Sequence, residues 1–474
     1  MDEAGCAMRR LCQWASATRP DAVPADVAER VAMVAADTIA CALGAADDAE
    51  LQAWTRDAGG GVSTGGMSAV AVPTSDARKA GYSLRACTVL GQPDLRLPPA
   101  SAAARNAIAA NWMQLDEGHH HLMCHAGIYC VPAALAECEA AHHDLGLFLH
   151  AIALGYEVTC RLARAWTFGA APVHPHALWS GLGATATVGI LRGLDGDTLH
   201  QALLHAATLA APRPFAIVAD GGLAANLWVG AGVEHAFTCV AWAQGGLPAP
   251  DHALARLGDM LHVHADTSAY TADLGDAWAI RQNYFKVLPC AGQSHASLEA
   301  LMEVRAKVLA RASGACDESV HIDAEVHDFA VGMDQRDVRT SLAARFSIPH
   351  LLAVAWLHGR TDADALGAGF LRDASVARLR HAIRLRPLRP ALPPPHHRAA
   401  RVTVTLRDGS SIQADCPAPL GSQARPLTAA DVGRKCAELP RGHHVALLDA
   451  LLRPDRASHA ARAMTIRSLV QSDG

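Results

Sequence analysis

The sequence lacks several features that would place it in other classes of protein. Aromatic residues make up only 5% of its 474 residues, whereas β-sandwiches are rich in Val, Ile, Tyr and Phe. No apolar run reaches the roughly 20 residues that a membrane-spanning helix needs. The net charge of -5 comes without a long run of either sign, so neither nucleic acid nor a membrane surface is indicated as a partner. A small-molecule partner is the better expectation.

Disulfide and targeting signals are also missing. The 13 cysteines are an odd number, scattered along the chain without C-x-x-C spacing, which is typical of reduced thiols in a reducing compartment. The start, MDEAGCAMRR, lacks the basic and then apolar layout of a secretory signal. We therefore expect a cytoplasmic protein.

What the sequence does contain is alanine-rich and helical. Half of the residues, 51%, are apolar, and the length favours two domains, with three as the alternative. Helices follow one another over residues 25–280; the clearest covers 145–165, with Asp144 as its N-cap. From Ala184 two more helices are expected, the second opened by Asp197 or Thr198.

The pattern changes after about residue 280. Residues 319–329 alternate apolar and polar side chains, which predicts a half-buried strand. Residues 401–414 predict a hairpin that turns at Asp408-Gly409. Two helices are expected between them, over 338–358 and 373–381.

We therefore expect a mainly α fold with two parts. The Pro-rich residues 386–397 predict a rigid loop, and Thr428 with Asp431 opens a C-terminal helix as a weak capping box. The predicted domains are an all-helical one, residues 1–279 and 426–474, and a smaller α+β lid domain, residues 280–425.

Leu115–Gly127, LDEGHHHLMCHAG, is the first of four groups of residues that could carry chemistry. Two carboxylates and four histidines crowd this loop, before a helix expected near Val131. Histidine transfers protons near neutral pH, and an adjacent carboxylate orients its ring. A solvated polar loop is the equally weighted alternative.

The second group is Pro172–Ser180, PVHPHALWS, just before a helix expected over 181–193. Its two histidines could face a cleft, and the helix N-terminus could receive a substrate carboxylate. A Pro-His loop that merely caps the helix is the alternative.

The other two groups are Gly221–Gly230, a small-residue turn with Asn226 as its main hydrogen-bonding side chain, and Asn283–His295, at the expected domain boundary. Clefts are common at such boundaries. Lys286 could pair with a carboxylate and His295 could transfer a proton. The default alternative is a solvated Lys286 and a His295 that packs at a helix start.

Two other chemistries stay open as alternatives. The 26 histidines could hold zinc, but neither H-E-x-x-H nor a C-x-x-C pair is present. Cys124 or Cys290 could be a nucleophile, although neither lies in a recognisable signature. No Gly-rich phosphate loop follows a predicted strand, which argues against a nucleotide cofactor.

The four groups, in this order, resemble the MmgE/PrpD family of dehydratases, decarboxylases and epimerases. LDEGHHHLMCHAG resembles the family's Asp-rich loop, VHPHALWSGLGATA its His-Pro loop, and YFKVLPCAGQSH its Lys, Pro-Cys and His motif. ARFSIPHLLAVAWLHG and PLTAADVGRKCAEL resemble later segments. The likeness covers most of the chain.

The resemblance implies a helical domain with an α+β lid, a homodimer, an active site between domains, and no metal or organic cofactor. Carried over residue by residue, the predicted catalytic residues are Asp116, His125, His174 and His295. The predicted substrate-binding residues are His119, His176, Asn226, Lys286 and Gln293.

The chain departs from the family pattern at two places. Gln114 stands where many members carry an acid. Ala225 stands where the family's Ala-Lys-Pro-Leu segment has a lysine thought to hold a substrate carboxylate. A lost charge-assisted hydrogen bond is worth roughly 1.5–3 kcal/mol, so the substrate is expected to differ from the family's tricarboxylates.

The expected activity is that of a lyase that removes a proton α to a carboxylate, with His174 or His125 as base, and most readily eliminates water. Decarboxylation and epimerisation share the carbanion-like intermediate and are the alternatives. A catalytically inactive carboxylate-binding protein is the alternative from another class.

Overall fold

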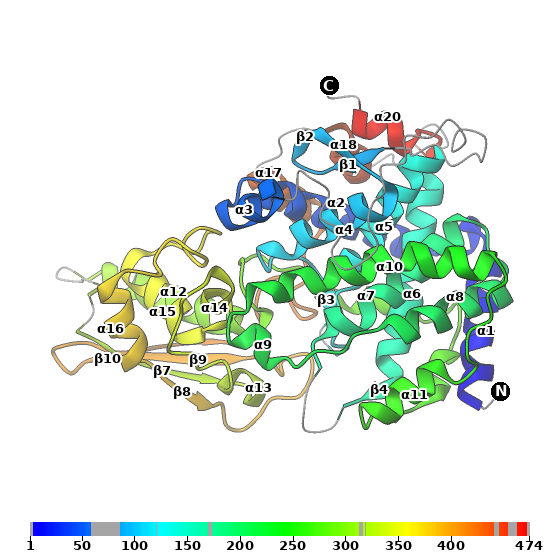
Figure 1. Cartoon of the computed structure of the whole chain (residues 1–474). Helices are drawn as coiled ribbons and strands as arrows, with labels where there is room; N and C mark the ends of the chain where they lie inside the picture. The colour runs from blue at the N-terminus through cyan, green and yellow to red at the C-terminus, as the bar shows by residue number, and fades with distance from the viewer. Residues whose placement is uncertain are drawn as a thin grey trace.

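The computed structural model describes residues 3–57, 86–119, 121–168, 173–311, 316–317, 319–439, 445–453 and 462–471 (Figure 1). It confirms a mainly α fold with a helical body and a smaller mixed body. One hydrophobic core takes its buried residues from Ala7 to Phe285 and again from Leu427 to Val470. The other core runs from Cys290 to Cys416 and adds Val218 and Ala225. The domain boundaries given above remain predictions, and the two cores are compatible with them.

Helix α7 (Pro175–Leu191) lies at the centre of the helical body. It packs against α5 (Ala126–Ala141), α6 (Leu145–Ala165), α8 (Gly196–Leu209) and α10 (Leu227–Gln244). Glycines permit this close packing, because a Cβ at Gly232 would lie 2.0 Å from Ser180 Oγ. The other helices of this body are α1 (Glu3–Ala17), α2 (Ala25–Ala45), α3 (Ala49–Asp57), α4 (Pro99–Trp112), α11 (Ala253–Met260), α17 (Ala429–Glu438), α18 (Val445–Leu452) and α20 (Ile466–Gln471).

The expectation of an all-helical body is wrong in one detail. Three short antiparallel pairs lie among its helices: β1 (Cys87–Val89) with β2 (Gln92–Leu97), β3 (Gly118–His119) with β6 (Asn283–Tyr284), and β4 (Trp166–Thr167) with β5 (His264–Ala265). Five of these strands have only two or three residues, too few to show a period of two, and the six residues of β2 do not alternate in burial. Three 3-10 turns also belong here: η1 (Pro20–Ala22), η4 (Thr267–Tyr270) and η5 (Ala279–Gln282). The turn η3 (Leu223–Asn226) contacts α10 of this body, but its Ala225 packs in the core of the mixed body.

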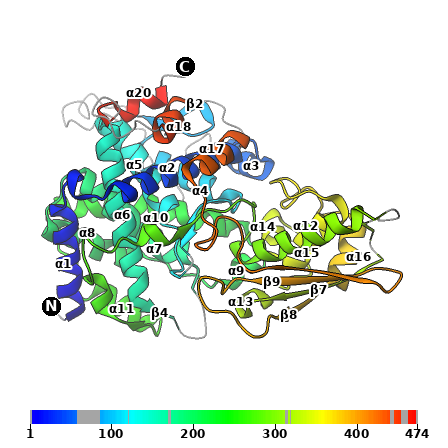
Figure 2. The ribbon, with the colours of Figure 1, turned by 180° about the vertical axis from the view of Figure 1, so that it is seen from behind.

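The mixed body is a four-stranded sheet with helices on one side (Figure 2). The strand order is β10 (Ser411–Cys416), β9 (Ala400–Thr405), β7 (His321–Val326) and β8 (Arg384–Pro387); only β7 and β8 run parallel. Helix α12 (His295–Leu309) packs on β9 and β10, and α15 (Ile348–His358) packs on α12. The body also holds α9 (Ala216–Ala219), α13 (Asp328–Val331), α14 (Ser341–Phe346), α16 (Ala374–Ala382) and η6 (Gly292–Ser294).

The predicted strand and hairpin are confirmed. Burial alternates along β7, β9 and β10, and Gly409 adopts a φ of +84° in the turn, a value that favours glycine. The rigid loop predicted over 386–397 is wrong at its start, because Arg386 and Pro387 end strand β8. An edge strand tolerates a proline because one of its sides has no partner strand.

Most predicted helices are confirmed, with corrected boundaries. Asp144 caps α6 through the N–H of Leu147, and Thr428 with Asp431 forms the capping box of α17. Helix α8 is capped by Asp195, two residues before the expected Asp197. The helix predicted over 338–358 is two helices, because Ser347 caps α15, whose second residue is a proline.

Helix α6 is the one helix of the described residues with the length and hydropathy to cross a membrane. Most of its apolar stretch, 83%, is buried inside the molecule. It therefore serves as a core helix of this fold.

Candidate active site

The first histidine-rich group forms a largely buried loop between α4 and α5, in which His121 and Met123 are exposed. His125 is the N-cap of α5, which begins at Ala126, so the helix start predicted near Val131 is five residues too late. Asp116 and Glu117 are fully buried, which excludes the alternative of a solvated polar loop. One of the loop's four histidines, His120, lies outside the described residues.

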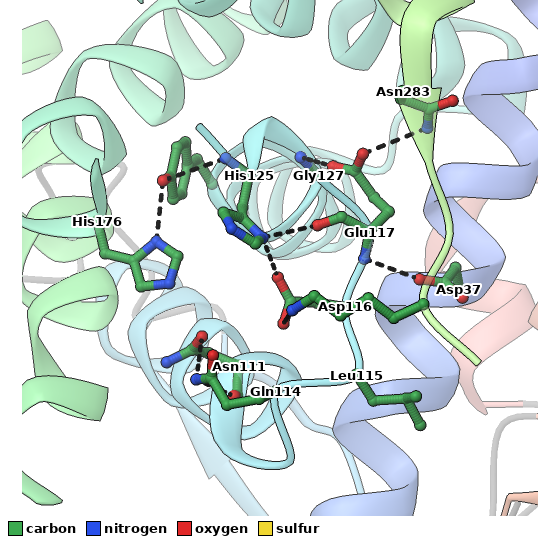
Figure 3. Close-up of polar contacts among 12 residues, drawn as sticks. Asp37, Asn111, Gln114, Leu115, Asp116, Glu117, His125, Gly127, His176 and Asn283 are labelled. Atoms are coloured by element: carbon green, nitrogen blue, oxygen red, sulfur yellow. Dashed lines mark hydrogen bonds and ion pairs between the residues drawn. The ribbon is translucent and has the colours of Figure 1, made fainter. Parts of the chain in front are cut away.

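His125 and Asp116 form a hydrogen-bonded pair (Figure 3). His125 Nδ1 lies 2.8 Å from Asp116 Oδ2 and 2.8 Å from the carbonyl oxygen of Glu117. A carbonyl oxygen can only accept, so Nδ1 carries the proton and donates to both oxygens. In the neutral ring the lone pair is therefore on Nε2, which is the form of histidine that removes a proton.

Lys286 lies on the other side of Asp116. Its Nζ is 3.4 Å from Asp116 Oδ1, and both side chains are buried. Burial alone would raise the pKa of Asp116, but the charges of Lys286 and His125 hold it below its usual value. Burial would lower the pKa of Lys286, but Asp116 raises it above the ordinary value. Asp116 is thus an ionised carboxylate able to stabilise a protonated His125.

Glu117 stabilises the loop by hydrogen bonds to α5, α6 and β6. Its carboxylate accepts from the N–H of Gly127 at 2.8 Å, from the Tyr156 hydroxyl at 3.1 Å and from Asn283 Nδ2 at 3.2 Å. Burial raises its pKa to about 7 despite these donors. Glu117 therefore ties the start of α5 to β6.

His174 and His176 stand at the start of α7, which begins at Pro175 and not, as predicted, at residue 181. The Tyr129 hydroxyl accepts from the N–H of His125 and lies 2.9 Å from His176 Nδ1. His176 Nδ1 is the one acceptor for the hydroxyl proton among the described hydrogen bonds, so the hydroxyl donates to it and His176 carries its own proton on Nε2. The N–H of His176 donates to His174 Nδ1 at 3.4 Å, which places the proton of His174 on Nε2 as well.

The start of α7 offers little to a substrate carboxylate, contrary to expectation. The N–H of His174 donates to the carbonyl of Arg213 at 2.8 Å, Pro175 has no N–H, and the N–H of His176 is used within the turn. The histidine side chains, rather than the helix end, are the donors on this wall.

His119 repeats this pattern from strand β3. The N–H groups of His121 and Leu122 both donate to its Nδ1 at 3.3 Å, so the proton is on Nε2. Burial first, and nearby charges next, lower the pKa of His119 and of His174 to about 3 and that of His176 well below its usual value. These three rings are neutral N–H donors at physiological pH.

A cleft brings most of the predicted site residues together. Its walls include His119, His125, His174, His176, Lys286 and Gln293. Asp116 lies behind this wall and reaches the cleft through His125 and Lys286.

Besides Asp116, two predicted residues do not line the cleft. His295 begins α12, is buried, and has no hydrogen-bond partner for Nε2 within the described part of the chain; burial and then Lys286 lower its pKa to about 3. Asn226 accepts from Asn111 at 3.2 Å and is likewise buried away from the cleft. The predicted convergence of three histidines holds for His125 and His174 only.

The sequence reasoning missed several residues of the site. Tyr284 and Arg398 line the cleft, and Tyr129 fixes the ring of His176. Tyr284 stands two positions before Lys286, where an extended segment points both side chains to one face. Arg398 follows the Pro-rich loop, and no local signal marks it.

Within the described ranges, no group of three or more His, Cys, Asp and Glu side chains is arranged to hold a metal ion. The cysteines Cys124 and Cys290 are buried thiols, and burial raises the pKa of Cys290 to about 12. The expectation of a site without metal or organic cofactor remains a prediction.

The fold and cleft define a class of protein: mainly helical, with a buried carboxylate–histidine pair where a helical body meets an α+β body. Residues 9–272 match the MmgE/PrpD N-terminal domain, and residues 288–446 match the MmgE/PrpD C-terminal domain. The chain belongs to the MmgE/PrpD family.

Three fungal relatives are similar over much of the chain. The cis-aconitate decarboxylase-like protein oryM of Aspergillus oryzae is 26% identical over 62% of this chain, which spans 61% of that protein's length. Two cis-aconitate decarboxylases of Aspergillus terreus are each 25% identical, over 73% and 87% of this chain and 70% and 84% of their own lengths. Together with the family, they support an enzyme with lyase-type activity.

Proposed function

We propose that this protein is a cofactor-independent lyase that makes a carbanion next to a substrate carboxylate, with His125 as the residue that moves the proton. The observation that carries the proposal is the hydrogen-bond polarity of the site. One ring, His125, has its lone pair on Nε2, backed by an ionised carboxylate. Two others, His174 and His176, are fixed as neutral donors.

This division of roles fits a reaction in which negative charge develops on the substrate. His125 Nε2 takes the proton from the carbon α to the carboxylate, and Asp116 stabilises the imidazolium that forms. The Nε2–H groups of His174 and His176, with Lys286, are the donors for the enolate-like charge. Donors already held in place stabilise such charge without reorganisation.

Elimination of water is the reaction that we place first. The electron pair of the broken C–H bond forms the double bond, and the hydroxyl leaves from the β carbon with the proton returned by His125. This first step needs a base, which is what the neutral tautomer of His125 supplies.

Loss of CO2 is a second candidate, favoured by the cis-aconitate decarboxylases among the relatives. There the carboxylate leaves as CO2, its bonding pair stays on the carbon framework, and the His125 imidazolium protonates that framework. The same residues serve both reactions, so the substrate decides between them.

A substrate panel in D2O tests the proposal. Purified protein is incubated with 2-methylcitrate, citrate and cis-aconitate; water loss, CO2 release and deuterium at carbon are followed by NMR. We expect turnover of at least one compound, with deuterium at carbon where CO2 is released or water is added, and a fall of about 10²–10⁴ in kcat for His125→Asn. His121→Asn, an exposed histidine of the same loop, is the matched control and should keep full activity.

Release of CO2 without deuterium at carbon in the product, or a fully active His125→Asn variant, contradicts the proposed chemistry. Binding of these carboxylates without any turnover would instead support the non-catalytic alternative.

A further inference from the structure

The site lacks one cation that the family resemblance led us to seek. Ala225, at the position of the family's lysine, lies in η3, is 2% exposed and packs in the core of the mixed body. Because Ala225 is enclosed in that core, a charged side chain from a neighbouring position of the same turn cannot take its place. A second carboxylate of a substrate must therefore meet its counter-charge elsewhere.

The charges on the cleft walls are all positive. Among the described residues that line the cleft, Lys286 and Arg398 are the formal cations, and there is no Asp or Glu. Lys286 is already ion-paired with Asp116 at 3.4 Å. Such a lining favours an anion with more than one charge, because a carboxylate buried beside unpaired acids would be repelled.

Arg398 enters the cleft from the mixed body, on the segment between β8 and β9. Its guanidinium carbon lies 5.3 Å from the centre of the Tyr284 ring, so the flat group rests near an aromatic wall that also lines the cleft. Arginine commonly stacks on aromatic rings, and its planar fork of N–H donors matches the geometry of a carboxylate.

Gly292 leaves the space that Arg398 occupies. A Cβ at Gly292 would lie 3.4 Å from Arg398 Nη1 and 2.9 Å from the Tyr284 hydroxyl. The glycine thus lets the arginine and the tyrosine approach the same wall, and residues from three segments of the chain build this end of the cleft.

The charge of Arg398 affects the pKa of histidines in both bodies. After burial and nearer charges, it contributes to lowering the pKa of His119 in the helical body and of His295 in the mixed body. An anion bound beside Arg398 would lie in the electrostatic field of the same guanidinium.

We propose that Arg398 binds a second carboxylate of the substrate, so that the site selects compounds with at least two carboxylates and takes its second cation from the mixed body instead of from position 225. The proposal rests on the proposed function, because it assigns a partner to the substrate of that same cleft. Lys286 and the histidine donors hold the carboxylate next to the reacting carbon, and Arg398 holds the distal one.

The test is equilibrium binding, which requires no turnover. Maleate, which keeps two carboxylates across a cis double bond, is compared with maleamate, its half-amide, by calorimetry at a pH where all carboxylates are ionised. We expect the wild-type protein to prefer maleate by a factor of about 10–100. Arg398→Gln should lose that preference by losing affinity for maleate alone, and Arg398→Lys should keep part of it.

Arg401→Gln is the matched control, since Arg401 is a nearby arginine paired with Asp415 and Glu325 outside the cleft. It should bind both compounds as the wild type does. Unchanged melting temperatures of the variants show that they are folded.

Equal loss of affinity for both compounds in Arg398→Gln, an unchanged preference, or a wild-type protein that binds neither compound would overturn the assignment of Arg398. If His125→Asn abolishes turnover while Arg398→Gln keeps the preference for maleate, the proposed function stands and this inference fails. If no substrate turns over but the preference depends on Arg398, this inference stands and the proposed function fails.

Discussion

At the scale of single residues, the loop after α4 carries two adjacent carboxylates with different roles. Asp116 is held ionised by Lys286 and His125, whereas burial raises the pKa of Glu117 from 4.5 to about 7. The surroundings of these two neighbouring acids thus shift their pKa values in opposite directions. Asp116 faces cations and Glu117 faces neutral donors.

Glu117 should make stability depend on pH. Its folded pKa lies above its unfolded value, so between these values the folded state keeps a proton that the unfolded state has lost, and stability falls as pH rises. Over that interval the loss amounts to about 3 kcal/mol. In urea unfolding at about pH 5 and about pH 8, Glu117→Gln should lose less stability than the wild type by about this amount.

The exposed Glu303, paired with Lys307 on the surface, provides the control: Glu303→Gln should follow the wild-type pH profile. Parallel profiles for the wild type and Glu117→Gln would mean that Glu117 titrates near its ordinary pKa when folded.

The sequence allowed many residues of the site to be located, but not the hydrogen bonds between them. His119, His125, His174, His176 and Lys286 lie in recognisable motifs, and all five reach the cleft. Which nitrogen of each ring carries the proton depends on partners that are distant in sequence, such as Tyr129 for His176. Arg398 lay beyond prediction for the same reason, since tertiary packing alone brings it to Tyr284.

At the scale of secondary structure, helix α17 braces the catalytic loop from behind. Lys435 Nζ lies 2.5 Å from Asp37 Oδ1 on α2 and 2.8 Å from the carbonyl oxygen of Leu115. The other oxygen of Asp37 accepts from the N–H of Glu117 at 3.1 Å. One buried ion pair therefore holds both peptide groups that flank Asp116.

Removing one member of this pair should affect both stability and activity. Lys435→Met leaves Asp37 buried without its cation, which typically costs 3–5 kcal/mol, and frees the loop that carries Asp116. We expect a lower free energy of unfolding in urea and a lower kcat, with the double variant Asp37→Asn/Lys435→Met recovering part of the stability. Arg434→Met, an exposed neighbour on the same helix, should change stability by no more than about 0.5 kcal/mol.

If Lys435→Met lowers stability but leaves kcat unchanged, α17 stabilises the fold without positioning Asp116.

Element boundaries show where sequence reasoning fails. The hairpin at Gly409, the Asp144 N-cap and the capping box of α17 were predictable because their signals are local. Helices α5 and α7 begin earlier than predicted because His125 and His174 take the N-cap positions, which Ser, Thr, Asp and Asn usually fill. A histidine at a helix start is a weak signal for a boundary, and here it marks the site.

At the scale of the whole molecule, the cleft lies where two hydrophobic cores meet. His125, His174 and His176 belong to the helical body, whereas Phe346 and Arg398 come from the mixed body. The mainly α character followed from composition, but this meeting of distant segments followed only from the resemblance. Sequence periodicity alone does not say which faces pack together.

Assembly is a further question at this scale, and the homodimer remains our proposal from the resemblance. Light scattering after size exclusion should give a mass of twice the 49.7 kDa chain, independent of protein concentration over the range loaded. A mass equal to one chain would contradict it.

The brace on the catalytic loop also has a consequence for biosynthesis. The two groups joined by the bond from Lys435 to Leu115 are 320 positions apart, and ribosomes deliver the earlier one first. While translation is in progress, a nascent chain can assemble its central helices but has no support behind Asp116. Catalytic activity should therefore appear late and abruptly, once α17 has emerged from the exit tunnel and packed behind the catalytic loop.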